Sequence, residues 1–424
     1  LWESSDMMYK YSLGMMAQKT NYLQQNPLPA DEAGLADMQP LPAVTHLEER
    51  AVPFVIDSVA FDRLVMELSA VFKNYKDIYN SSVRLNGLEM DIYRLTTEGV
   101  QLKKPGGAIS LVVSGSVRCD DGSSLSDSFS LSLQNPAELP SIEQLKERTK
   151  VFAEGLLRLK GIPLVAEYYN GPVMFEGGAV ATILANNLLN PGGLIATRSL
   201  GPTRGGLGNQ FGQRIIDSRL TIKNYTTKKE YSGTSLYGYY EVDGEGVTPE
   251  AEMTLVDKGV FKKMLNGRIP AKNALETTGS SRFMMIPQSP TVTTGTGTIH
   301  VQVDKGISHE KMKKVLIKAA KEAGQSCAYI VRGISGATLE VYRVDLKDGK
   351  EARVRATSFR LPDLTKLLKL VAISSKEEVL NYLPNNYPAS MIYPAGIIVD
   401  GLVIEKATVK AEKEPVLTLP QQRK

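Results

Sequence analysis

The sequence is poor in the side chains that most often carry chemistry. Its 424 residues include two cysteines, Cys119 and Cys327, together with three histidines and one tryptophan. Two cysteines exclude a disulfide framework and allow at most one isolated bridge, so cysteine usage leaves the cellular compartment open. No apolar run approaches the roughly 20 residues that a membrane-spanning helix needs, and we expect no membrane span.

An excess of charge of one sign is also missing. Lysine and arginine total 50 against 46 aspartate and glutamate residues, which leaves a net charge of +4. The basic residues form no long block and few aromatic residues stand near them, whereas a nucleic-acid-binding surface concentrates basic residues on one face or along one helix. We therefore expect no nucleic-acid partner.

The motifs of common hydrolases and nucleotide-binding proteins are absent as well. The sequence has no G-x-S-x-G elbow, no P-loop and no complete dinucleotide fingerprint. A catalytic zinc site needs about three protein ligands. Neither His46 nor His300 is followed by glutamate, and after His309-Glu310 lysines take both places where an H-E-x-x-H or H-E-x-x-x-H motif would have its second histidine.

The histidines and cysteines all have simple structural explanations. We expect His309 to be a solvated residue in the first turn of a charged helix and His46 to be solvated beside a Pro-rich segment. His300 lies in an alternating segment, which predicts a strand position facing solvent or a polar pocket. Cys119 and Cys327 adjoin apolar strand-like runs, so both are expected to be small buried residues rather than nucleophiles.

What the sequence does contain is the composition of a globular protein. Hydrophobic residues make up 42% and charged residues 23%, with 36 glycines and 22 prolines. At roughly 150 residues per domain, the length predicts two or three domains. We expect an α+β fold in two lobes: residues 1–165 with helices on an antiparallel sheet, and residues 166–424 as a larger β-rich lobe of mostly antiparallel strands.

Apolar spacing and turn residues locate the elements within these lobes. An alternating region over residues 81–133 predicts an antiparallel meander with turns at Asn86-Gly87, Glu98-Gly99 and Asp120-Asp121-Gly122. Residues 171–190 predict a strand that leads into a helix, and short strands dominate beyond residue 214. Further helices are predicted at 2–23, 57–75, 141–160, 309–323 and 361–370.

Four segments together resemble one family. They are Gly171-Pro-Val-Met-Phe-Glu-Gly-Gly-Ala-Val180, Leu255-Val-Asp-Lys-Gly-Val-Phe261, Thr278-Gly-Ser-Ser-Arg282 and Gly336-Ala-Thr-Leu-Glu-Val-Tyr342. Their order and spacing resemble the TldD/PmbA family of peptidase-like proteins, also described as modulators of DNA gyrase, from about residue 80 to residue 409. The resemblance implies that family's fold and a role in peptide processing or proteolysis.

The resemblance also implies a changed catalytic motif. Glu176 falls at the position of the family's catalytic glutamate, whereas Phe175 and Val180 fall where its two zinc-binding histidines stand. The chain thus resembles the PmbA (TldE) side of the family, whose members also lack the motif and pair with a metal-bearing TldD subunit. No cofactor is then expected, and Glu176 is either a catalytic relic or a carboxylate that stabilises the positive end of the following helix.

Three hypotheses follow. The first is a non-catalytic subunit that acts with another TldD/PmbA-family chain, as a homodimer or heterodimer, on a peptide or unfolded protein that adds a strand to a sheet edge. The second is an active metallopeptidase whose zinc is held by carboxylates, by His300 or by a partner chain. The third is a peptide-binding or scaffold protein of the cell envelope.

Two features remain open at this stage. The family implies a cytoplasmic protein, but an exported form is not excluded because the sequence starts at Leu1 within a helix-like segment, and an upstream part is expected to be missing. The Gly-rich stretch 192–208 is expected to be a lid, a partner contact or a loose surface segment.

Overall fold

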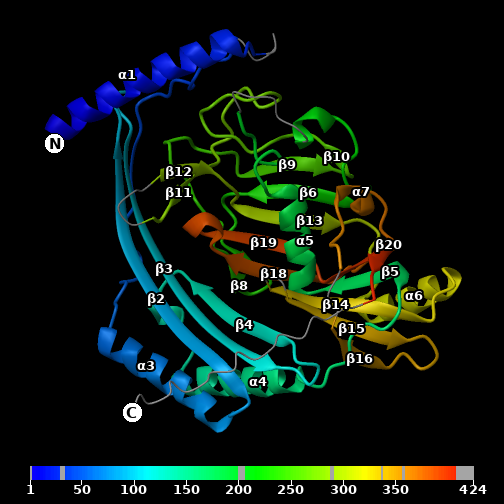
Figure 1. The fold of residues 1–424 in the computed structure, drawn as a ribbon. Coiled ribbons are helices and arrows are strands. Elements are labelled where there is room, and N and C mark those ends of the chain that lie inside the picture. The colour runs from blue at the N-terminus through cyan, green and yellow to red at the C-terminus, as the bar shows by residue number, and fades with distance from the viewer. Residues whose placement is uncertain are drawn as a thin grey trace, which may run out of the picture.

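The structure is a computed structural model that describes residues 2–28, 34–198, 206–286, 291–335, 338–355 and 359–406. It confirms the α+β class: helices and one sheet precede two larger, mostly antiparallel sheets (Figure 1). The helices are α1 (Trp2–Gln25), α3 (Ser58–Val71), α4 (Ile142–Arg158), α5 (Gly178–Leu188), α6 (His309–Glu322) and α7 (Leu364–Leu367), with short 3-10 turns at Phe72–Asn74, Pro136–Glu138, Leu207–Gln210 and Pro384–Asn386.

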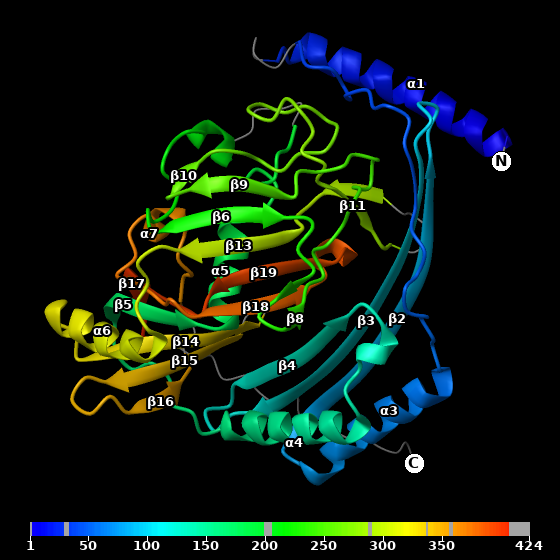
Figure 2. The ribbon, with the colours of Figure 1, turned by 180° about the vertical axis from the view of Figure 1, so that it is seen from behind.

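The N-terminal sheet is built around one very long hairpin. Its strands pair with each other from Ile78 opposite Val117 to Leu95 opposite Gln101, a length of about 60 Å at 3.3 Å per residue. Figure 2 shows this hairpin curving alongside the rest of the molecule. The strands of this sheet are β1 (Thr45–Leu47), β2 (Ile78–Leu95), β3 (Gln101–Arg118) and β4 (Ser124–Leu133), of which β1 runs parallel to β3 and the others are antiparallel.

Helices α3 and α4 pack against this sheet, and local sequence signals explain where they begin. The Asp57 side chain accepts a hydrogen bond from the backbone N–H of Ala60 and caps α3. Ser141 and Gln144 form a reciprocal capping box at the start of α4. Both helices bury apolar side chains against β3, so the predicted helices at 57–75 and 141–160 are confirmed in position and role.

The predicted turn at Asn86-Gly87 is wrong, because both residues lie inside β2. A Cβ added at Gly87 would lie 3.2 Å from a methyl group of Ile109, so close packing against β3 accounts for this glycine. The chain reverses instead at the predicted second turn, where Gly99 has φ +89°.

Two six-stranded sheets form most of the remaining described part of the chain, and α5 lies between them (Figure 1). The first sheet has the order β10-β9-β6-β13-β19-β18 and the second the order β16-β15-β14-β5-β20-β17. Helix α6 covers the face of the second sheet opposite α5. The strands are β5 (Tyr169–Glu176), β6 (Leu220–Tyr225), β9 (Glu252–Asp257), β10 (Val260–Phe261), β13 (Thr298–Val303), β14 (Cys327–Ser335), β15 (Thr338–Asp345), β16 (Glu351–Val354), β17 (Ala372–Ile373), β18 (Glu377–Tyr382), β19 (Ala389–Pro394) and β20 (Gly396–Ile404), with small hairpins β7–β8 (Glu230–Tyr231, Thr234–Ser235) and β11–β12 (Ser281–Met284, Thr291–Thr294).

The helix predicted at 361–370 is reduced to the single turn α7. Asp363 caps it, and the backbone N–H of Leu370 donates to the carboxylate of Asp217 instead of continuing the helix. The strand and helix predicted within 171–190 and the helix predicted at 309–323 are confirmed as β5, α5 and α6. Part of the Gly-rich stretch, residues 199–205, and residues 336–337 of the fourth resembling segment lie outside the described residues.

Polar contacts join the N-terminal sheet to the larger sheets. Arg268, whose side chain is 4% exposed, donates to the backbone oxygen of Gln39 at 2.8 and 2.5 Å and to the carboxylate of Glu98 at 2.8 Å. At the other end of the hairpin, Arg355 pairs with Asp121. The hydrogen bonds of Ser123 and the nearby guanidinium lower the pKa of Asp121 to about 2.

Helix α1 lies apart from these layers, beside the tip of the long hairpin (Figures 1 and 2). None of its side chains is buried, although it carries several large apolar residues. Trp2 is 88% exposed, and Met7, Met8, Tyr9, Tyr11 and Met16 are each more than 60% exposed. No helix among the described residues is long and apolar enough to cross a membrane.

Candidate functional site

The junction between β5 and α5 carries the residues singled out by the sequence. Phe175, near the end of β5, is completely buried, and its ring stacks on that of Phe359 with 6.1 Å between centroids. Val180, in the first turn of α5, is also completely buried, as expected for a core residue. Both side chains belong to the apolar core that fills the space between the two large sheets.

Glu176 follows Phe175 and faces the other side of the sheet. Its Oε2 accepts a 2.8 Å hydrogen bond from Nε of Arg332, and its Oε1 lies 3.3 Å from Nε2 of His309. Gly177, not Glu176, is the N-cap residue of α5, and α5 has no side-chain cap hydrogen bond. The carboxylate of Glu176 pairs instead with side chains of β14 and α6.

The ion pairs of Glu176 extend into a larger cluster. Arg332 also donates to Glu351 at 2.8 Å, Lys313 pairs with Glu351 at 2.8 Å, and the guanidinium lies 4.6 Å above the ring of Tyr342. Burial opposes the shift, but the hydrogen bonds of Arg332 and Lys313 lower the pKa of Glu351. Burial opposes a rise in the pKa of Arg332, but the hydrogen bonds to Glu351 and Glu176 raise it. The cluster is thus a balanced network of fixed charges.

His309 departs from its expected position. The helix prediction was right, but the side chain is only 27% exposed and turns toward Glu176 instead of toward solvent. The sequence signal for this contact is weak, because β5 and α6 are more than a hundred residues apart and meet only when the second sheet forms.

His300 occupies a polar pocket, one of its two expected environments. It is 5% exposed on the central strand β13, and its Nε2 lies 2.9 Å from Glu377. Tyr231 donates its hydroxyl to the same carboxylate. Burial would raise the pKa of Glu377, but the hydrogen bonds from His300 and Tyr231 lower it. The hydrogen bond to Glu377, together with burial, raises the pKa of Tyr231 to about 12. Cys119 and Cys327 are buried, as expected, and no disulfide joins them.

Comparison with known proteins identifies the family. A model of the PmbA/TldA metallopeptidase C-terminal domain matches residues 169–405, more than half of the chain. This chain belongs to the PmbA/TldD family. The matched region starts at β5 and includes both large sheets, α5 and α6. No curated protein matches the sequence significantly.

Solved structures share the fold of this PmbA/TldD-family chain at low sequence identity. TldE from Thermococcus kodakarensis is 15% identical and superposes with a TM-score of 0.54, over 90% of this chain and 81% of that one. A proposed modulator of a DNA gyrase from Thermotoga maritima is 14% identical, with a TM-score of 0.55 over 88% and 81% of the two chains. A protein of the same description from Bacteroides thetaiotaomicron is 15% identical, with a TM-score of 0.51 over 85% and 76%.

The residues around the β5–α5 junction do not suit a zinc ion. Zinc takes imidazole, thiolate or carboxylate ligands, but Phe175 and Val180 offer no donor atom and are packed in the core. Glu176 is already engaged by Arg332 and His309. Within the described ranges, no three or more His, Cys, Asp or Glu side chains are grouped so that they could hold a metal ion.

Proposed function

We propose that this chain is a non-catalytic member of the PmbA/TldD family that acts in peptide processing together with another family chain. The observation that carries the proposal is the chemistry of the β5–α5 junction. Two core side chains stand where the zinc ligands would be, and the glutamate between them is held in an ion-pair network. A general base needs a carboxylate that can reach and take the proton of its substrate, whereas both oxygens of Glu176 already face cationic or imidazole groups.

A partner chain is supported by helix α1. A protein that works alone rarely exposes many large apolar side chains on a helix that has no buried residue. The exposed tryptophan, methionines and tyrosines of α1 are residue types that are enriched in protein interfaces. We propose that a second family chain, identical to this one or metal-bearing, covers this helix. The division of the chain near residue 165, between α4 and β5, remains a prediction.

The substrate proposed is a peptide or an unfolded segment of protein. Strand β18 is an edge of the first large sheet and β16 an edge of the second, so an extended peptide has edges on which to pair. The opposite edges, β10 and β17, already bond to residues 212–213 and to Ile307. Such pairing uses main-chain hydrogen bonds and is therefore tolerant of sequence, which suits a protein that processes varied peptides.

The test is a peptide-cleavage assay on this chain alone and mixed with a family chain that carries the H-E-x-x-x-H motif. We expect cleavage only in the mixture, and we expect Glu176→Gln in this chain to leave the rate of the mixture unchanged within about twofold, since a lost general base lowers rates by 10²–10⁴-fold. Glu351→Gln is the matched control, because it removes a carboxylate from the same network. A large loss of rate in Glu176→Gln but not in Glu351→Gln would refute a non-catalytic role.

A further inference from the structure

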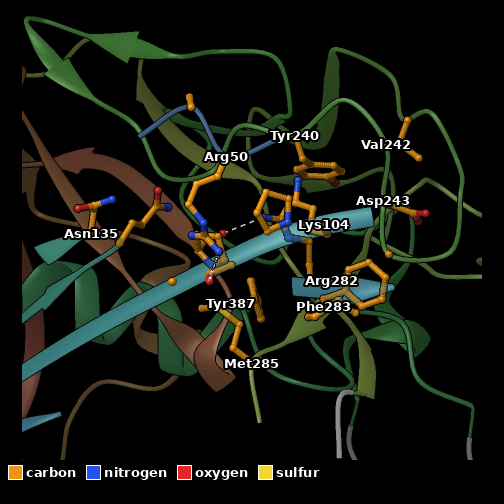
Figure 3. A pocket seen from close by; sticks show the side chains of 18 of the residues that line it. Arg50, Lys104, Asn135, Tyr240, Val242, Asp243, Arg282, Phe283, Met285 and Tyr387 are labelled. Atoms are coloured by element: carbon orange, nitrogen blue, oxygen red, sulfur yellow. Dashed lines mark hydrogen bonds between the residues drawn. The ribbon is translucent and has the colours of Figure 1, made fainter. Parts of the chain in front are cut away.

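A cavity of about 290 Å³ lies between the N-terminal sheet and the larger sheets. Strands β2 and β3 contribute one wall, and β11 with the segments before β9 and β19 contributes the other (Figure 3). Gly106 of β3 allows the two parts to approach closely here, because a Cβ at this position would lie 2.7 Å from the sulfur of Met285. Small-ligand sites often occur in such crevices, and this volume suits a molecule of amino-acid size.

Arg282 is the central polar residue of this cavity. It is 5% exposed, its guanidinium lies 3.9 Å above the ring of Tyr240 and 5.6 Å from that of Tyr387, and one nitrogen donates to the backbone oxygen of Pro388 at 2.8 Å. Its Nη1 is buried without a hydrogen-bond partner among the described residues. A buried, charged donor that lacks an acceptor is unfavourable, so an acceptor from a ligand would relieve it.

The other charged groups that line the cavity already have partners. Arg50 pairs with Glu89 and Asp91, and the ammonium of Lys104 contacts both oxygens of Glu48 at 2.7 and 2.8 Å. The Asp243 carboxylate accepts three backbone N–H groups, and Glu138 accepts the hydroxyl of Tyr237. No ion pair to Arg282 is formed by the described residues, so its charge is the one in this cavity left without a compensating anion.

We propose that this cavity binds an organic carboxylate with a small apolar body, anchored on Arg282. A guanidinium presents its donors in a fork that matches a carboxylate. The remaining lining is largely apolar, with Val52, Ile92, Val242, Phe283, Met285 and Pro388 among its residues. A phosphate dianion fits less well, because one free cation faces two resident carboxylates, Asp243 and Glu138, at the same cavity.

The cavity is separate from the β5–α5 junction. Pro388 lines the cavity directly before β19, whereas Gly396, which pairs with Glu176, follows that strand. The six residues of β19 at about 3.3 Å each place roughly 20 Å between the two sites. Binding at this cavity therefore does not depend on whether the chain takes part in peptide processing. The carboxylate could be the carboxyl end of a peptide or a free carboxylic acid, since both present the same group to Arg282.

The experiment is calorimetric titration of the whole chain with N-acetyl-leucine, N-acetyl-leucinamide and 3-methylbutanoate at constant ionic strength. We expect the two acids to bind and the amide to bind at least about tenfold more weakly, since a charge-assisted hydrogen bond is lost. Tighter binding of N-acetyl-leucine would assign the site to peptide ends, and tighter binding of 3-methylbutanoate to free acids. Equal binding of acid and amide, or no binding of either acid, would overturn the proposal.

Two variants place the binding in this cavity. Arg282→Gln is expected to weaken binding of the acids at least about tenfold, whereas Arg63→Gln, at an exposed arginine of α3, should leave it unchanged. Ala51→Trp keeps Arg282 and adds bulk at an exposed position of the lining, so it should also abolish binding while the chain stays folded by circular dichroism. Unaltered affinity in Ala51→Trp and Arg282→Gln would overturn the assignment.

Discussion

Phe175→Ala is expected to lower the free energy of unfolding by about 3–5 kcal/mol. The ring is completely buried between the two large sheets and stacks on Phe359, so its removal loses buried apolar area and leaves a cavity. Urea denaturation followed by circular dichroism measures the loss. This position decides the interpretation of the site, because a side chain on which the core depends is not free to be replaced by a metal ligand.

The control for Phe175→Ala is Phe175→Leu, which keeps most of the volume. We expect it to cost about 1.5 kcal/mol or less, in line with conservative changes of shape in a core. A loss below about 1 kcal/mol in the alanine variant would contradict the account, since it would mean that the position is loosely packed.

Arg268→Ala is expected to lower the free energy of unfolding by about 3 kcal/mol. Its guanidinium is almost fully buried and joins Gln39 and the hairpin residue Glu98 to the loop after β10. Removing it leaves the backbone oxygen of Gln39 without this donor and also removes the packing of the buried arginine side chain. Glu98 is 34% exposed, so water can solvate its carboxylate after the pair is lost. Denaturant titration of the variant measures the effect.

An exposed arginine provides the comparison for Arg268→Ala. Arg63 is 73% exposed and pairs with Glu67 one turn further along α3, so Arg63→Ala should cost no more than about 0.5 kcal/mol. Similar losses in the two variants would show that Arg268 does not hold the hairpin to the larger sheets.

Local signals in the sequence predicted the elements whose stability depends on nearby residues. Asp57 and Ser141 cap helices three residues before the groups they bond, and Gly99 permits the left-handed turn that closes the hairpin. The burial of Phe175 and Val180 agrees with the usual place of large apolar side chains in cores. These features need no knowledge of which strands are neighbours.

Features that depend on distant neighbours could not be predicted in this way. Val151 is an apolar residue of α4, yet it is 56% exposed and lies outside the buried face of that helix. Asn86-Gly87 is a dipeptide typical of turns, yet both residues pair with β3 inside the long hairpin. The glycine is explained by the nearness of Ile109, which leaves little room for a side chain. His309 meets Glu176, and Arg282 meets the long hairpin, only through the tertiary fold.

The family's fold is present here, and the β5–α5 junction combines apolar packing with a charge network. Phe175 and Val180 fill the core on either side of the junction, and Glu176 joins Arg332, His309 and Glu351 in the network. Such a network fixes the relative positions of β5, β14, β16 and α6, so Glu176 has a structural role in any case.

The most direct test of a non-catalytic role is the metal content of the purified, chelator-treated and zinc-reloaded chain, measured by elemental analysis beside peptide cleavage on the same sample. The account predicts far less than one zinc per chain and no cleavage by the chain alone. Zinc near one per chain, with cleavage that a chelator abolishes, would contradict it. The zinc would then have to be held by other residues, because Phe175 and Val180 offer no donor atom.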